Sequence, residues 1–194
     1  MKQRLYVAYG SNLNFEQMVR RCPTAKLVGT GVIENCELQF KGYQTNAYAT
    51  IAPKMGGKVP VAVWDIQPQD EKRLDVYEGY PRHYYKKGVR VQMKNGDKLN
   101  AMVYIMNQKM QFGMPSAQYF CTVYQGYQDC GLDTHVLSDA VQKSAMRYYQ
   151  DLADTYAQQM KLRVPETESE EEEELDEEDY EDEKEQEYTE GMQL

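Results

Sequence analysis

The sequence predicts one α+β domain followed by an acidic tail. Segments with strand character dominate up to residue 106, segments with helical character dominate after it, and no internal repeat is found. Strands grouped before helices are typical of α+β folds, so we expect a mostly antiparallel or mixed sheet. The 194 residues suit a single domain with a core of normal size. We place this domain at residues 1–163 and the tail at residues 164–194.

Short apolar runs separated by glycine predict the strands. The first run, Leu5-Tyr6-Val7-Ala8-Tyr9, has the pattern of a buried strand and stops at Gly10. Asn95-Gly96 separates the last two runs and predicts a tight hairpin, because both residues tolerate the positive φ angles of such a turn. The other strand-like runs cover residues 27–33, 37–40, 47–51, 59–66, 87–93 and 99–106.

Proline and capping residues set the limits of the predicted helices. Pro23 ends the first helix, Pro68 lies near the first turn of the second, and Ser116 is the expected N-cap of the third. In the fourth predicted helix, apolar residues recur at helical spacing. The helices are expected at about residues 15–22, 69–77, 117–128 and 134–160.

Charge is distributed very unevenly along the chain. Residues 166–194 contain 17 acidic residues and one lysine, a net charge of −16. Residues 1–165 contain 14 acidic and 21 basic residues, a net charge of +7. The tail has too few apolar residues to offset the entropy cost of ordering, so we expect it to be disordered in isolation.

Several protein classes do not fit this composition. The segment from Met1 to Arg4 leads straight into a strand, unlike a secretory signal, and no run approaches the length of a membrane span. The four cysteines and two histidines form no CxxC pair, disulfide framework or zinc pattern. The basic body has no Lys/Arg stripe interleaved with aromatic residues, which disfavours nucleic acid as a partner. We expect a cytoplasmic protein that binds no metal, membrane or nucleic acid.

Two segments carry residues suited to catalysis. Tyr9-Gly10-Ser11-Asn12 is a turn between a strand and a helix, where backbone N–H groups can face an anion or a developing oxyanion. Glu78 ends a short helix before Gly79, where the helix dipole and neighbouring tyrosines favour a raised pKa and general acid/base function. The alternatives are structural: a turn whose Asn12 caps the helix, and an exposed glutamate in a loop.

A third segment, Pro115-Ser116-Ala117-Gln118-Tyr119, opens a helix and can direct Tyr119 toward a pocket, although a core position is the alternative. Taken in order, the three segments resemble the γ-glutamylcyclotransferase family. That family has a Tyr-Gly-Ser-Asn-type loop, a catalytic Glu followed by Gly and a later tyrosine, and a Pro-Ser-x-Gln-Tyr helix start. The resemblance covers about residues 4–145.

The resemblance implies a compact mixed β-barrel flanked by helices, acting on a small γ-glutamyl substrate without metal or organic cofactor. It implies that Glu78 is the acid/base and that 5-oxoproline is released. The residues between Glu78 and Tyr85 match relatives acting on γ-glutamylamines as well as those acting on γ-glutamyl dipeptides, so the leaving group stays open. The substrate-binding residues implied are Tyr6, Val7, Ala8, Tyr9, Gly10, Ser11, Asn12, Tyr85 and Tyr119.

Two other functions are compatible with the same sequence. A non-catalytic binding module would keep the pocket and leave the carboxyl group unused, and it would be favoured if Glu78 lay away from the Gly10 turn. A protein that acts through charge would use the acidic tail to mimic nucleic acid or to bind basic partners.

We predict that deletion of residues 166–194 lowers solubility but leaves folding and kinetic constants unchanged, because a strongly charged tail with few apolar residues acts mainly as a solubilising segment. The measurement is steady-state kinetics of the full-length and truncated chains at low and high salt. A lower KM for the truncated chain at low salt, lost at high salt, would instead show that the tail competes with an anionic substrate.

Overall fold

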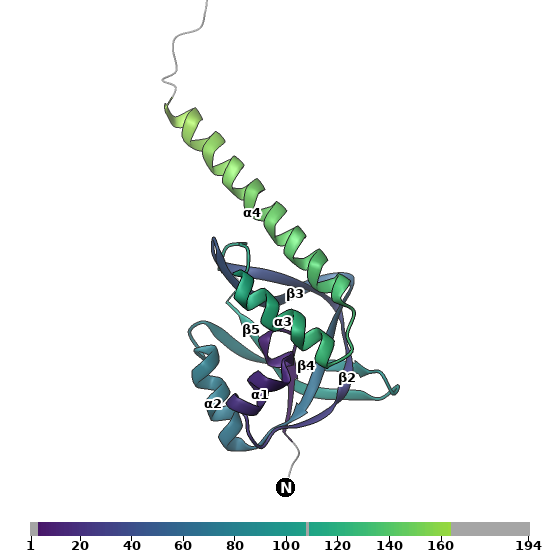
Figure 1. Ribbon diagram of the computed structural model, residues 1–194. Helices are drawn as coiled ribbons and strands as arrows, with labels where there is room; N and C mark the ends of the chain where they lie inside the picture. The colour runs from purple at the N-terminus through teal and green to yellow at the C-terminus, as the bar shows by residue number, and fades with distance from the viewer. Residues whose placement is uncertain (1–3, 108, 164–194) are drawn as a thin grey trace, which may run out of the picture. The chain divides into compact units, whose positions relative to one another are not determined.

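A computed structural model describes residues 4–107 and 109–163 (Figure 1). Five strands close into a barrel in the order β1-β3-β2-β4-β5. Strand β1 closes it by pairing antiparallel with β3 and parallel with β5, so the barrel is mixed and the predicted α+β class is confirmed. The strands are β1 (Leu5–Ala8), β2 (Lys26–Tyr43), β3 (Asn46–Asp65), β4 (Tyr84–Met93) and β5 (Lys98–Met106).

Strands β2 and β3 form one long antiparallel hairpin that the sequence had divided into four shorter runs. The Gly56-Gly57 pair, expected to separate two strands, lies within β3. A Cβ atom at Gly57 would lie only 2.3 Å from the backbone oxygen of Cys36, so this glycine permits a close approach between the strands. The register shift between Glu34 and Cys36 is a bulge at the same place. The glycines therefore bend one ladder instead of ending it.

The helices follow the predicted order. They are α1 (Phe15–Arg21), α2 (Pro68–Glu78), α3 (Ala117–Asp129) and α4 (Thr134–Arg163), and a short 3-10 helix η1 (Ser11–Leu13) precedes α1. Ser116 caps α3 as expected, accepting a hydrogen bond from the Tyr119 amide at 3.3 Å. Asn14, not Asn12, caps α1, because the Asn14 side chain accepts from the Gln17 amide at 3.0 Å.

Helix α4 packs through the predicted apolar stripe. Leu137 and Ala140 are buried in the core, and the Ser144 hydroxyl accepts a hydrogen bond from the Phe40 amide at 2.9 Å. The chain divides into two compact units at Thr155/Tyr156, and the first of these contains the barrel. None of the described helices is both long and apolar enough to cross a membrane. The acidic tail at residues 164–194 lies outside the described residues, so its predicted boundary and disorder stay predictions.

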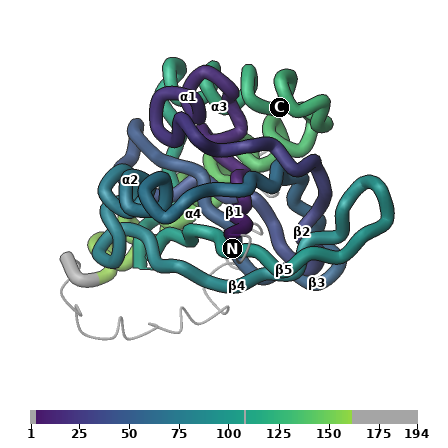
Figure 2. The backbone as a smooth tube through the Cα atoms, turned by 90° about the horizontal axis from the view of Figure 1, so that it is seen from below, coloured from purple at the N-terminus to yellow at the C-terminus, as the bar shows by residue number. Residues whose placement is uncertain are grey.

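Helix α3 packs directly against the short helix η1. Figures 1 and 2 show α1 beside α3. Gly126 makes this approach possible, because a Cβ atom there would lie 2.5 Å from the Asn14 nitrogen and 2.7 Å from the Leu13 carbonyl carbon. Backbone thus packs on backbone at the point where α3 supports the turn after β1.

We predict that Gly126→Ala destabilises the protein by about 1–3 kcal/mol, although alanine is normally the better helix former, because the new methyl group overlaps main chain. The measurement is thermal unfolding. Gly88→Ala in β4 is the matched control, since a Cβ atom there meets nothing within 4 Å. An unchanged or raised Tm for Gly126→Ala would contradict the proposed backbone contact.

Candidate active site

The turn after β1 is built around close contact at Gly10. A Cβ atom at Gly10 would lie 3.2 Å from both the Ala49 Cβ atom and the Tyr119 hydroxyl oxygen. The φ angle of Gly10 is −118°, so the glycine serves the close approach and no positive φ requires it. The Tyr119 hydroxyl also accepts a hydrogen bond from the Ala49 amide at 3.2 Å. Helix α3, strand β3 and the turn therefore meet at this point.

Asn12 in η1 connects this turn to Glu78. Its side-chain nitrogen donates one hydrogen bond to Glu78 Oε1 at 3.0 Å and one to the Tyr6 hydroxyl at 2.7 Å. Asn12 is buried, with only 4% of its surface exposed. The two segments that the sequence singled out are thus in direct contact, and Glu78 does not lie away from the Gly10 turn.

Glu78 is the last residue of α2, and the chain leaves the helix immediately after it. Gly79 adopts the left-handed conformation, with φ 63°, and the Tyr80 amide donates to the Asp75 carbonyl oxygen at 2.9 Å. A side chain at Gly79 would be strained by this φ angle and would also approach His83 Cδ2 to 2.6 Å. The Glu-Gly pair therefore ends the helix with the carboxyl group at the pocket.

The pKa of the Glu78 carboxyl group is shifted toward neutral pH. Desolvation by burial raises its pKa to about 7, and this effect outweighs the lowering caused by the Arg21 charge and by the Asn12 hydrogen bond. Tyrosine side chains around it are also desolvated, and the pKa values of Tyr6, Tyr9, Tyr84 and Tyr119 are all raised by burial. Their hydroxyl groups stay neutral, so one titratable carboxyl group faces uncharged phenols.

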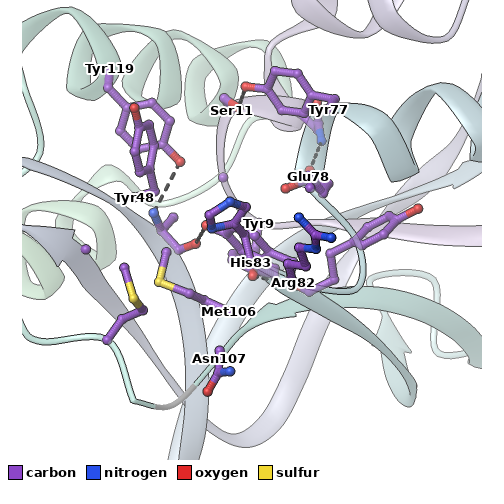
Figure 3. A pocket seen from close by; sticks show the side chains of 18 of the residues that line it. Tyr9, Ser11, Tyr48, Tyr77, Glu78, Arg82, His83, Met106, Asn107 and Tyr119 are labelled. Atoms are coloured by element: carbon purple, nitrogen blue, oxygen red, sulfur yellow. Dashed lines mark hydrogen bonds between the residues drawn. The ribbon is translucent and has the colours of Figure 1, made fainter.

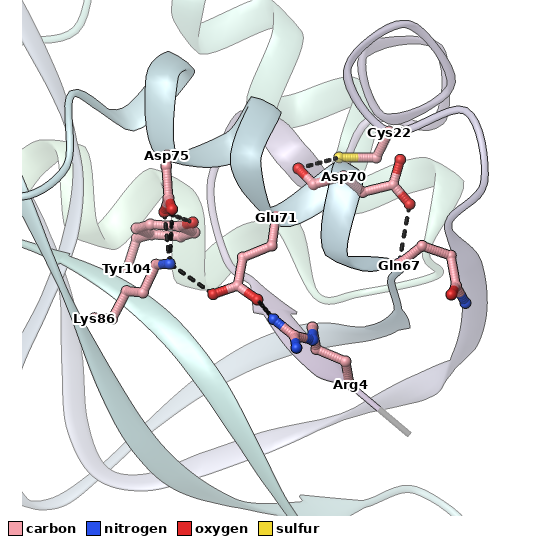
Figure 4. Close-up of polar contacts among 8 residues, drawn as sticks. All are labelled: Arg4, Cys22, Gln67, Asp70, Glu71, Asp75, Lys86 and Tyr104. Carbon is pink, nitrogen blue, oxygen red and sulfur yellow. Dashed lines mark hydrogen bonds and ion pairs between the residues drawn. The ribbon is translucent and has the colours of Figure 1, made fainter. Parts of the chain in front are cut away.

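A polar network anchors α2 to the barrel one turn before Glu78 (Figure 4). Lys86 Nζ in β4 lies 2.7 Å from Asp75 Oδ1 and 2.6 Å from Glu71 Oε1. The Tyr104 hydroxyl in β5 donates to Asp75 Oδ1 at 2.5 Å, and Arg4 pairs with Glu71. Because Asp75 precedes Glu78 by one helical turn, these contacts restrict the position of Glu78.

These elements enclose a pocket of about 680 Å³, which Figure 3 shows with Glu78, Tyr9 and Tyr119 around it. Its lining comes from β1 and η1, from the ends of α2, β2 and β5, from β3, β4 and α3, and from the segments that follow α2 and β5. The lining residues are Tyr6, Tyr9, Gly10, Ser11, Asn12, Gly42, Tyr43, Tyr48, Ala49, Val76, Tyr77, Glu78, Gly79, Arg82, His83, Tyr84, Tyr104, Met106, Asn107, Lys109, Met110 and Tyr119.

Most of the residues expected at the site line this pocket, and three do not. Val7 and Ala8 are buried in the barrel core, each with 1% of its surface exposed. Tyr85 is 38% exposed and is not a lining residue, whereas its neighbour Tyr84 is. Successive side chains of a strand point to opposite faces, and the hydroxyl of Tyr84 donates to the Ala49 carbonyl oxygen at 3.0 Å. The residues brought together are Tyr6, Tyr9, Gly10, Ser11, Asn12, Glu78 and Tyr119.

Several residues in or beside the pocket were not among the expected site residues. Tyr48 packs edge-to-face on Tyr119, with ring centroids 4.9 Å apart, and Tyr104 packs likewise on Tyr6 at 5.9 Å. Arg21, at the end of α1, contacts the turn without lining the pocket. The spacing from Pro23 gives the end of α1 but not the direction of this side chain. Within residues 4–107 and 109–163, no three His, Cys, Asp or Glu side chains cluster as metal ligands.

Comparison with known proteins agrees with the fold. The family described as γ-glutamyl cyclotransferase, AIG2-like, matches residues 6–121. The γ-glutamylcyclotransferase of Homo sapiens is 30% identical over 136 residues, covering 66% of this chain and 72% of that protein. That of Mus musculus is 28% identical with the same coverage. A solved γ-glutamyl cyclotransferase structure is 26% identical with a TM-score of 0.66, covering 72% of this chain and 86% of the other.

The family match spans the strands, helices and turns from β1 into α3, which are the segments that build the pocket. The expected barrel flanked by helices and the expected family are both confirmed. The chain belongs to the AIG2-like γ-glutamyl cyclotransferase family and is a γ-glutamylcyclotransferase-like enzyme.

Proposed function

We propose that this enzyme cleaves γ-glutamyl amides by intramolecular cyclisation, with Glu78 as the acid/base and the Tyr9–Asn12 turn as the substrate cradle. One observation carries the proposal: the carboxyl group of Glu78, with its pKa raised to about 7, contacts Asn12 of the turn within a single pocket. A group with this pKa can accept a proton and return it near neutral pH.

The reaction needs little beyond positioning and proton transfer. The α-amino nitrogen of the γ-glutamyl unit attacks its own γ-carbonyl carbon, and Glu78 accepts the proton that this nitrogen loses. The bond between the carbonyl carbon and the leaving nitrogen then breaks as Glu78 returns the proton to that nitrogen. The products are 5-oxoproline and the free amine. Holding the two reacting atoms together can contribute about 7–11 kcal/mol in well-oriented intramolecular reactions.

The turn supplies donors for the oxygen that becomes negative during this reaction. Ser11 and Asn12 stand at the start of η1, where backbone N–H groups have no acceptor within the helix. Gly10 brings the Tyr119 hydroxyl against the same turn. One such donor is often worth about 3 kcal/mol of transition-state stabilisation. We assign the oxyanion site to this turn.

The charges around the pocket favour an anionic leaving group. Arg82 and Lys109 line the pocket, and Glu78 is the only acidic residue among the described lining residues. Eight tyrosines and two methionines are among the other lining residues. A leaving amino acid carries a carboxylate that these cations attract, whereas a leaving diamine carries a second positive charge that they repel. We therefore favour γ-glutamyl amino acids over γ-glutamylamines with a cationic leaving group.

A Glu78 side chain lying away from the turn would have favoured the non-catalytic binding module, and the contact between Asn12 and Glu78 gives that alternative no such support. A function through the acidic tail concerns residues outside the described part of the chain, and no described contact favours it.

We predict that Glu78→Gln lowers kcat by about 10²–10⁴-fold with an unchanged Tm or a higher one, because the amide keeps the shape but cannot shuttle a proton. The assay measures 5-oxoproline release from the best substrate in a panel of γ-glutamyl amino acids and γ-glutamylamines. Glu16→Gln, at an exposed ion pair in α1, is the control and should retain the wild-type rate. Undiminished turnover by Glu78→Gln would refute the assignment.

The pH profile gives a second prediction. Glu78 must be ionised to accept the proton, so kcat/KM should rise with pH and level off above an apparent pKa of about 7. An unperturbed glutamate would give a limb near pH 4.3, about three units lower. The measurement is kcat/KM between pH 4.5 and 9 at constant ionic strength. A flat profile across pH 5–8 would contradict a base with this pKa.

A further inference from the structure

Arg21 is held against the Tyr9–Asn12 turn from several sides. Its Nη1 atom donates to Asn12 Oδ1 at 2.6 Å and to Ser11 Oγ at 3.0 Å. Its Nη2 atom donates to Gln17 Oε1 at 2.7 Å, and its guanidinium carbon lies 3.7 Å from the centre of the Tyr77 ring. A guanidinium group held by three hydrogen-bond acceptors and an aromatic face has little rotational freedom.

These contacts fix which end of the Asn12 amide faces Glu78. The guanidinium group can only donate hydrogen bonds, so the Asn12 atom next to it must be the carbonyl oxygen. The amide nitrogen then points the other way, and its two N–H groups are both used, one on Tyr6 and one on Glu78. Without Arg21, the amide could rotate and present its oxygen to the carboxylate, which is repulsive.

We propose that Arg21 is a positioning residue, which acts on the proposed acid/base chemistry by locking the Asn12 amide so that it donates to Glu78. The proposal rests on the assignment of Glu78 as the acid/base. Arg21 does not line the pocket, so it acts through Asn12 and Ser11 and not by contact with substrate. Because Asn12 lies between Arg21 and Glu78, the Arg21 charge can stabilise the ionised carboxylate without forming an ion pair that would hinder proton transfer.

The charges around Glu78 agree with this role. Both Arg21 and the Asn12 hydrogen bond lower the pKa of Glu78 and oppose the larger rise caused by desolvation. The pocket also contains Arg82 and His83 from the segment after α2. The other titratable groups that interact with Glu78 lie in or directly after β1 and α1, and in β4, β5 and α3. They are Tyr6, Tyr9, Cys22, Tyr84, Tyr104 and Tyr119.

The test compares Arg21→Met with Arg20→Met in the full-length chain. We expect Arg21→Met to lower kcat by about 10–100-fold, the usual effect of losing a hydrogen bond to a charged group, with a smaller change in KM. The acidic limb of its kcat/KM profile should move to higher pH, because both influences that favour the ionised carboxylate are lost. Arg20→Met removes an exposed ion pair with Glu16 on the same helix and should change neither quantity.

A limb for Arg21→Met that coincides with the wild-type limb overturns the proposal even if the rate falls, because a purely structural role lowers the rate without moving the limb. Arg21→Lys keeps the charge but loses the planar fork, so it should lower kcat with a smaller displacement of the limb. If Arg21→Met does not fold, Arg21→Lys decides the matter, and a wild-type kcat for that folded variant overturns the proposal.

A double-mutant cycle tests whether Arg21 acts through Asn12. In an Asn12→Ala background, Arg21→Met should lower kcat by much less than it does in the wild type, because only the direct influence of the Arg21 charge is left to lose, whereas fully additive losses in kcat would overturn the proposed relay. Glu78→Gln is assayed in parallel to separate the two hypotheses. An active Glu78→Gln enzyme refutes the proposed function itself. An inactive Glu78→Gln enzyme with Arg21 variants that behave like Arg20→Met refutes only the role of Arg21.

Discussion

The desolvated carboxyl group of Glu78 is the constraint on which the pocket depends. In the unfolded chain this group ionises near pH 4.3, whereas in the folded chain its pKa is about 7. Between these values the folded protein holds a proton that the unfolded chain releases, so this group makes stability fall as pH rises through the interval. Above both pKa values, a fully desolvated group with such a shift would lower the free energy of unfolding by about 4 kcal/mol, and a partly exposed residue such as Glu78 lowers it by less.

Contacts from parts of the chain far apart in sequence offset the free-energy cost of burying Glu78. Asn12 donates to the carboxyl group from η1, and the Lys86 network holds α2 from the barrel wall. Gly10 and Gly126 let β3, α3 and η1 approach closely enough to support the turn. The barrel therefore serves the site by fixing the end of one helix against the start of another, and each contact limits how far Glu78 can move.

The sequence predicted the parts of this arrangement that depend on local chemistry. Glycine after Glu78, serine before α3 and the turn at Gly10 each have a local conformational or capping reason to occur where they do. The predicted strand limits were less accurate where pairing between distant segments determines the structure. Gly56 and Gly57 have the pattern of a strand break, but they lie at the register shift within β3, and pairing with the long strand β2 continues on both sides of them, at Pro53 and at Lys58.

The site residues likewise divide into those that local sequence predicts and those that only the folded structure places. A tyrosine after Glu78 was expected to face the substrate, and strand alternation brings Tyr84 into the pocket where Tyr85 had been expected. Arg21 could not be identified at all, because its role depends on the folded positions of Ser11, Asn12 and Tyr77. Ser11 and Asn12 lie only 10 and 9 residues from Arg21, but neither this separation nor the distant contact with Tyr77 produces a periodicity or motif in a single sequence.

Two acidic side chains one helical turn apart in α2 have separate environments, and this separation identifies the acid that is free to move a proton. Asp75 is occupied by Lys86 at 2.7 Å and by the Tyr104 hydroxyl at 2.5 Å, and it does not line the pocket. Glu78 forms no ion pair with any described residue, and its direct side-chain partner is the neutral amide of Asn12. A carboxylate paired with a cation loses charge stabilisation when it is protonated, which hinders a proton shuttle. The network that uses up Asp75 therefore both anchors α2 and leaves Glu78 as the carboxyl group able to exchange a proton in the pocket.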